Sequence, residues 1–277
     1  MENKSMYESD FLKLLTYRFD NGADFWATAD GKIGIDNPIS TLTALLIMSE
    51  LRISKSDIML KGTAELVLSK VRECGRVSIA PKGSIYPCHT AVSAAALCRN
   101  GYSDELPVRL MLNYLLSNRY EDGGWRCNKF IYGRGPETNY SNPGVTLFAL
   151  DAFRCAGMNN NPDLDTAVET LLKHWTIRMP LGPCHFGIGK QFMQIEYPFL
   201  RYNNFYYIYV LSFYSKAKND KRFLEALSSL KEKIDDQNLI IVGNTNRKLA
   251  QLEFCRKGKA SLAATERYLE IINNLKA

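Results

Sequence analysis

No hydrophobic run in this 277-residue sequence is long enough to cross a membrane. The longest uncharged apolar stretch, Phe205 to Ser215, has eleven residues, whereas a membrane-spanning helix needs about twenty. The first ten residues also lack the apolar core of a signal peptide. These absences predict a soluble cytoplasmic protein with no membrane span.

The sequence also lacks a strong charge of one sign and a disulfide framework. The formal net charge is only +6 and the basic residues are dispersed, so we expect no nucleic-acid binding. The seven cysteines are an odd number in a long chain, without a Cys-x-x-Cys spacing, which is typical of reduced thiols. With 46% hydrophobic and 23% charged residues, the composition is that of a globular protein, and we predict one domain over residues 1–277.

A repeated unit of two segments occupies most of the chain. Each copy has a strongly apolar first segment, a short polar turn and an amphipathic second segment. Four full copies and a shorter fifth can be aligned, with first and second segments at 38–51 and 55–73, 87–99 and 104–119, 143–155 and 162–175, 204–214 and 221–234, and 247–255 and 262–275. A period near fifty residues is too long for tetratricopeptide or ankyrin repeats.

The two kinds of segment predict different positions in the fold. In the segment 162–175, Leu164, Leu171 and Trp175 share one helical face, opposite Asp165 and Lys173, so this helix keeps one side in water. First segments are apolar on nearly every side and must be interior. We therefore predict an all-α fold, an α/α toroid of about five to six helical hairpins with first segments as the inner ring. An open helical solenoid is the alternative, in which both helices of a pair keep a solvated face.

Loop lengths predict which end of the toroid carries the function. Connections from a first to a second segment are short, whereas those leading to the next first segment are long, at 74–86, 120–142, 179–203 and 235–246. Long loops carry binding and catalytic residues more often than short ones. We expect the site on the face where the inner helices begin.

The segment 121–127, Glu-Asp-Gly-Gly-Trp-Arg-Cys, resembles the glycine-aromatic repeat of the prenyltransferase and squalene-hopene cyclase superfamily. The glycines permit a tight turn and the tryptophan packs between hairpins. The resemblance implies an α/α barrel with an aromatic-lined cavity for isoprenoid chains, and a partner subunit in some members. The catalytic signatures of the superfamily are missing: segment 163–166 lacks the last carboxylate of an Asp-x-Asp-Asp motif, and no Asp-x-Cys pair occurs.

The cysteines divide into two groups. Three recur near the ends of first segments, before a glycine, and are predicted to be packing residues: Cys98, Cys155 and Cys255. The other four lie in long loops or at the start of first segments: Cys74, Cys88, Cys127 and Cys184. His89 and His185 follow two of them. Because zinc prefers thiolate and imidazole ligands, we predict a zinc site formed by Cys88, Cys127 and either Cys184 or His185. Ordinary reduced cysteines are the alternative.

Ten aromatic residues lie between Phe192 and Tyr214. Aromatic faces line apolar cavities and stabilise cations. We predict a set of ligand-binding residues in the cavity and on its rim, with core packing as the alternative: Tyr197, Tyr202, Tyr206, Tyr209, Trp125 and Arg201. Arginines and lysines of the long loops, together with helix amino termini, offer a site for a diphosphate, although interspersed acidic residues favour a mixed solvated surface.

Two functions follow from these features. The first is a prenyltransferase-like or terpenoid-cyclase-like protein, an enzyme or a former one, that binds an apolar ligand such as an isoprenoid diphosphate in the toroid, with zinc on the rim. The second is a non-catalytic toroid that binds a peptide or partner protein on its long-loop face. The missing acid motif favours the second function, whereas the aromatic interior and the clustered cysteines and histidines favour the first.

Overall fold

The computed structural model describes residues 6–34, 39–83, 85–127, 139–182, 187–234 and 239–276. Over these residues the protein is helical, and β-structure is limited to isolated bridges. The prediction of an all-α fold is therefore confirmed. Within the same ranges, no helix is both long enough and apolar enough to cross a membrane.

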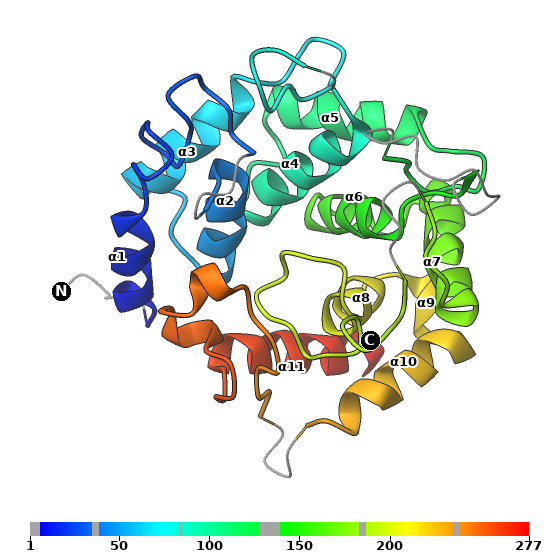
Figure 1. Ribbon diagram of the computed structural model, residues 1–277. Helices are drawn as coiled ribbons and strands as arrows, with labels where there is room; N and C mark the ends of the chain where they lie inside the picture. The colour runs from blue at the N-terminus through cyan, green and yellow to red at the C-terminus, as the bar shows by residue number, and fades with distance from the viewer. Residues whose placement is uncertain are drawn as a thin grey trace.

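The helices alternate along the chain between an inner and an outer layer (Figure 1). The inner helices are α2 (Thr41–Glu50), α4 (Pro87–Arg99), α6 (Pro143–Cys155) and α8 (Asn204–Leu211). The outer helices are α3 (Ile58–Leu68), α5 (Leu106–Ser117), α7 (Asp165–Ile177) and α10 (Lys221–Lys231). The remaining helices are α1 (Glu8–Thr16), the short α9 (Ser215–Lys218) and α11 (Leu262–Lys276).

Burial separates the two layers as the sequence predicts. Ala94, Leu147 and Ile208, on α4, α6 and α8, have no exposed surface. On α7, Asp165 and Lys173 are exposed. The third polar residue of that face, Glu169, is half-buried because its carboxylate pairs with an arginine of α10. The all-apolar segments are thus interior helices, and the one-sided segments cover them.

The helices pack in chain order, and the two ends of the chain meet. Helix α2 packs on α4, α4 on α6, α6 on α8 and α8 on α11, while each outer helix covers the inner helix before it. In α1, the Asp10 carboxylate accepts hydrogen bonds from the N–H groups of Glu253 and Phe254, at 2.7 and 2.9 Å. Glu50 of α2 pairs with Arg267 of α11 at 2.9 Å. The first and last units of the repeat are therefore neighbours.

The fifth unit departs from the predicted pattern. Its first segment is not an inner helix but two short 3₁₀ turns, η3 (Arg247–Leu249) and η4 (Glu253–Cys255). The physical reason is the contact with α1: the N–H groups of Glu253 and Phe254 bond to Asp10, so they do not continue a helix from η3. Helical periodicity in nine residues was too weak a signal to reveal this break.

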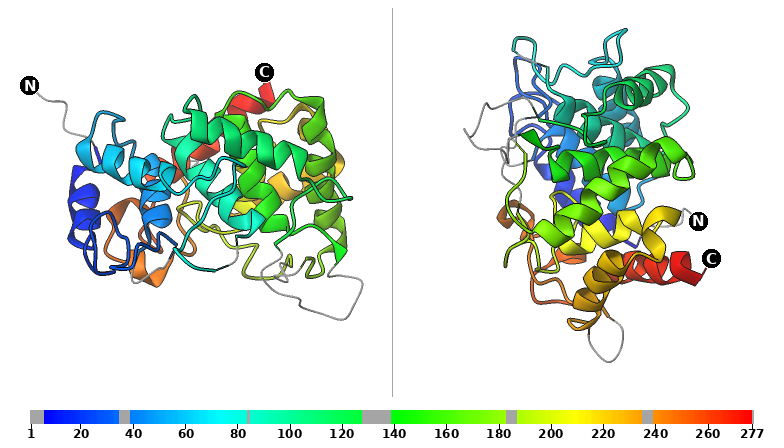
Figure 2. Two further views of the ribbon diagram at one scale, coloured as in Figure 1. Left: turned by 90° about the horizontal axis from the view of Figure 1, so that it is seen from above. Right: turned by 90° about the vertical axis from the view of Figure 1, so that its right-hand side faces the viewer.

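The described parts of the long connections gather mainly on one face, as Figure 2 shows. We call this the long-loop face. The segment that leads from α7 to α8 crosses the middle of the inner layer (Figure 1). Within this segment Tyr197 and Phe199 are fully buried, and the Phe199 ring stacks on Tyr206 of α8 at 5.0 Å. Part of the interior enclosed by the inner helices is thus filled by a loop of the protein itself.

Candidate functional site

The turn after α5 depends on two glycines. Gly123 has a positive φ of 93°, and a Cβ added there would lie 2.5 Å from the Cβ of Thr166. A Cβ on Gly124 would lie 2.6 Å from the Thr146 hydroxyl of α6. The Asp122 carboxylate accepts a hydrogen bond from the Gly124 N–H at 3.2 Å. Only glycine fits these two positions, so the motif brings the chain tightly against α6 and α7.

Trp125 anchors the next part of the turn. Its side chain is fully buried, its indole N–H donates to the Leu115 carbonyl of α5 at 2.9 Å, and its ring lies 5.8 Å from that of Phe153. The Trp125 backbone N–H donates to Thr146 on α6. Trp125, predicted from the sequence as a ligand-binding residue, therefore lies in the core between α5 and α6, two residues before Cys127.

The structure brings two predicted metal ligands together. Cys88 is the second residue of α4, Cys127 follows the Trp125 turn, and their sulfur atoms are 3.4 Å apart. Two thiolates bound to tetrahedral zinc at 2.3 Å lie about 3.8 Å apart. The pair is therefore slightly closer than two zinc-bound thiolates, at a distance at which the Cys127 thiol donates a hydrogen bond to the Cys88 sulfur. Cys184 and His185 lie outside the described residues, and within those residues no group of three His, Cys, Asp or Glu side chains is arranged to hold a metal.

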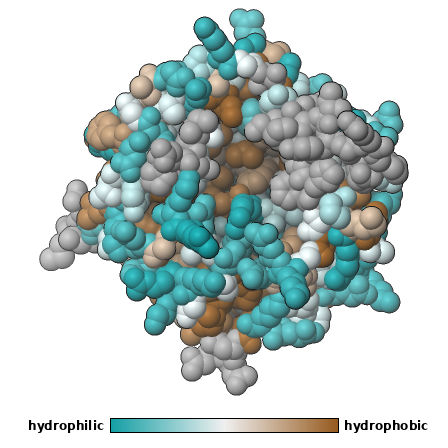
Figure 3. Space-filling model, in the orientation of Figure 1, coloured by the Kyte–Doolittle hydropathy of each residue, from teal (hydrophilic) through white to brown (hydrophobic). Residues whose placement is uncertain are grey.

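A hollow lined by hydrophobic residues opens on the long-loop face (Figure 3). Most inner-helix side chains have no exposed surface, but Leu42, Val145 and Phe148 keep 6–8%. All three lie in the first two turns of α2 or α6, at the end where the long loops gather. The inner helices thus present apolar side chains at the open end of the interior.

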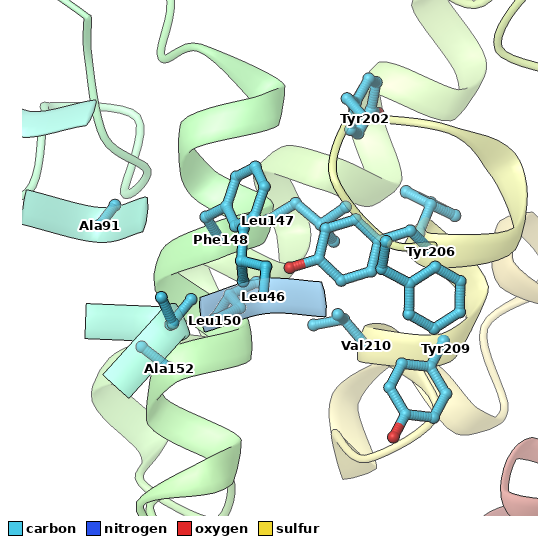
Figure 4. Close-up of a cluster of buried hydrophobic side chains, with 14 of the residues drawn as sticks. Leu46, Ala91, Leu147, Phe148, Leu150, Ala152, Tyr202, Tyr206, Tyr209 and Val210 are labelled. Atoms are coloured by element: carbon cyan, nitrogen blue, oxygen red, sulfur yellow. The ribbon is translucent and has the colours of Figure 1, made fainter. Parts of the chain in front are cut away.

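Three of the predicted tyrosines lie deeper in the core. Figure 4 shows Tyr206 and Tyr209 projecting from α8, with Tyr206 directed toward Phe148 and Leu150 of α6. Tyr197, Tyr206 and Tyr209 are at most 2% exposed. Their hydroxyl groups donate hydrogen bonds to the carboxylates of Glu50, Asp151 and Glu270, at 2.9, 2.7 and 2.6 Å respectively. Through Glu50 and Asp151, Tyr197 and Tyr206 connect the apolar interior to a set of buried charges.

We call this set the ionic cluster; it consists of Glu50, Arg99, Asp151, Arg154 and Arg267. Asp151 of α6 accepts hydrogen bonds from Arg99 and Arg154, both at 2.6 Å, and has no exposed surface. Glu50 accepts a hydrogen bond from Arg267 at 2.9 Å. Arg99 also donates to the Phe199 carbonyl at 3.4 Å, which ties the loop in the interior to α4.

Both carboxylates of the ionic cluster are held in the charged form. Burial raises the pKa of Asp151, but Arg154, Arg99 and the hydrogen bond from Tyr206 lower it more, so the pKa falls below its ordinary value. For Glu50, burial likewise opposes the charged form, and Arg267 and Arg99 lower the pKa overall. A carboxylate that stays ionised does not act as a buried general acid. The contacts of the cluster join α4 to α6 and to the Phe199 loop, and α2 to α4 and α11.

Tyr202 and Arg201, the two other predicted ligand-binding residues, line a pocket of about 600 Å³ between the end of α7 and the start of α8. We call it the cationic pocket, because Arg178, Lys190 and Arg201 all contribute to its wall. The sequence placed Lys190, Arg201 and Tyr202 in one long loop and offered the loop cations as a site for a diphosphate. It gave no indication that Arg178, at the end of α7, joins them.

Comparisons with known proteins give no family. No protein-family model matches the chain, and no curated protein matches it. Among solved structures, the chain is similar to the crystal structure of a protein from Actinoplanes, with a TM-score of 0.47 and 15% sequence identity, over 98% of this chain and 83% of that one. The function must therefore be argued from the site itself.

Proposed function

We propose that the protein is a closed α/α toroid that binds zinc through Cys88 and Cys127 and takes an apolar ligand into the hollow beside the long loops. The observation that carries this proposal is the 3.4 Å separation of the two sulfur atoms. Ring closure is supported by the contacts that join α1 and α2 to residues 253–267.

The two cysteines are suited to metal binding for different reasons. Cys88 lies in the first turn of α4, where the partial positive charge of the helix amino terminus favours a thiolate. Cys127 is only 2% exposed and is held by the neighbouring Trp125 anchor. A bound zinc ion lowers the pKa of a coordinated water or thiol and so supplies a nucleophile near neutral pH. Cys184 or His185 completes the site in this proposal.

The proposed ligand belongs to the isoprenoid class. Leu42, Val145 and Phe148 give the open end of the interior an apolar lining, and apolar walls suit a prenyl chain. A prenyltransferase-like or cyclase-like activity is the reaction class of the superfamily that the glycine-aromatic motif resembles, and the chain lacks the Asp-x-Asp-Asp and Asp-x-Cys signatures of that superfamily.

Metal analysis tests the zinc proposal. Protein purified without a metal-binding tag and supplied with zinc should contain about one zinc per chain. Cys88→Ser and Cys127→Ser should each lose most of it, because each removes one of the two paired ligands. Cys74→Ser is the matched control, since Cys74 is exposed in a loop and should leave the zinc content unchanged. Metal-free wild-type protein, or full zinc content in both serine variants, would contradict the proposal.

A non-catalytic toroid that binds a peptide or partner protein is favoured by one specific observation. The Tyr197 and Phe199 side chains and the ionic cluster fill the interior below the hollow, which leaves the long-loop face as the accessible surface. Wild-type protein that fails to retain zinc would favour this second function over the first.

A further inference from the structure

The cationic pocket carries more positive charge than its neighbours neutralise. Arg201 donates two hydrogen bonds to the buried Glu196 carboxylate, at 2.7 and 2.8 Å, and Asn244 donates a third at 3.0 Å. Arg178 and Lys190 have no salt-bridge partner in the part of the chain that the structure describes. Among the lining residues that the structure describes, one carboxylate therefore accompanies three cations.

Arg178 is exposed to solvent, but two contacts restrain it. It ends α7 with a left-handed φ of 58°, its N–H bonds to the His174 carbonyl, and its guanidinium lies 4.8 Å from the centre of the Trp175 ring. The negative end of the α7 dipole stabilises a cation beside the carboxyl terminus of the helix, and this explains why an arginine lies at position 178. Lys190 lies in the loop before α8, is exposed to solvent and contributes to the pocket wall.

The floor of the cationic pocket is aromatic and fixed. Phe192 and Tyr202 are 4% and 7% exposed, and their ring centres are 4.8 Å apart. The His174 ring bonds through Nε2 to the Met179 carbonyl at 3.0 Å, so Nε2 carries the proton and Nδ1 accepts. The Tyr202 hydroxyl therefore donates to Nδ1, at 2.8 Å, which fixes the orientation of its ring.

We propose that the cationic pocket binds a small amphipathic anion, whose carboxylate or phosphate group contacts Arg178 and Lys190 and whose apolar body lies on Phe192 and Tyr202. Arginine binds planar carboxylates and phosphates through two parallel hydrogen bonds, and a preformed aromatic floor lowers the entropic cost of binding. This site is separate from the Cys88 and Cys127 pair, and the inference does not depend on zinc.

Calorimetric titration of the full-length protein tests this inference with four probes. Phenyl phosphate and hippurate carry an aromatic body with a phosphate or a carboxylate, inorganic phosphate lacks the body, and benzyl alcohol lacks the charge. Saturable binding is expected for at least one of the first two, which also identifies the preferred anion. Inorganic phosphate should bind more weakly, and benzyl alcohol should not bind measurably.

Variants locate the binding. Arg178→Gln and Lys190→Gln should each weaken binding of the preferred probe about tenfold, the loss of one charge-assisted contact. Lys61→Gln, on the exposed face of α3, is the matched control and should have no effect. Unchanged affinity in both pocket variants, or equal binding of benzyl alcohol, would overturn the inference. Titration of Cys88→Ser separates the two proposals, because anion binding should persist in this variant while zinc is lost.

Discussion

Replacing Asp151 by asparagine should lower the free energy of unfolding by about 3–5 kcal/mol. This is the usual cost of removing one partner of a buried ion pair while the other charge stays buried. The amide would keep the shape of the side chain but remove the carboxylate that compensates Arg154, and it would leave Arg99 with Glu50 alone, at 3.4 Å. Urea unfolding monitored by circular dichroism measures the change. Glu65→Gln is the matched control: its pair with Lys61 is exposed on both sides, so the loss should stay below about 1 kcal/mol.

The pH dependence of stability gives a second readout of the same change. Because the folded-state pKa of Asp151 lies below its unfolded value, its stabilising contribution is present above the unfolded pKa, near 3.9. It is lost as the pH falls through the folded-state pKa. Wild-type protein should therefore lose stability below about pH 4 more steeply than Asp151→Asn. Equal stability of the two proteins at pH 7, or parallel pH profiles, would show that the ionic cluster does not hold the inner helices together.

Trp125→Ala should cost about 3–5 kcal/mol as well, the usual range for truncating a fully buried large aromatic residue. The indole contacts Phe153 and donates to the Leu115 carbonyl, so its loss leaves both a cavity and an unpaired acceptor. The same variant should lose zinc, because Cys127 would no longer be held opposite Cys88. Chemical denaturation and metal analysis of one preparation measure both effects.

Phe19→Ala provides the comparison for this truncation, because Phe19 is 55% exposed and its removal should cost less than about 1 kcal/mol. A small loss of stability in Trp125→Ala, similar to that of Phe19→Ala, would mean that the turn is held by its glycines alone. If the Trp125→Ala protein is destabilised but still retains zinc, metal binding does not depend on the packing of Trp125.

The sequence predicted the helices better than it predicted the interior they enclose. Apolar patterning identified α4, α6 and α8 as buried helices and α7 as a half-exposed one, because this periodicity reflects burial directly. It also placed Cys88 and Cys127 in loops or at a helix start on the same face, and the structure brings them together. Periodicity says nothing, however, about where a long loop runs. Core packing of the aromatic residues was the alternative to ligand binding, but the path that brings Tyr197 and Phe199 into the interior was not predicted.

The ionic cluster was also missed, although the sequence held a signal for it. Glu50, Arg99 and Asp151 each interrupt or end an otherwise apolar first segment. A charge in a helix that is buried on every side needs an opposite charge nearby, and the recurrence of such residues in three successive inner helices indicates that they meet. The partners Tyr206 and Arg267, from distant parts of the chain, are not apparent without the three-dimensional arrangement.

The central claim is that Cys88 and Cys127 share one zinc ion. The most direct measurement is a crystal structure of the zinc-loaded protein with anomalous diffraction recorded on either side of the zinc absorption edge. The proposal predicts one anomalous peak about 2.3 Å from both sulfur atoms, with Cys184 or His185 as a further ligand. A covalent bond between the two sulfurs, or a zinc peak elsewhere with none between Cys88 and Cys127, would contradict it.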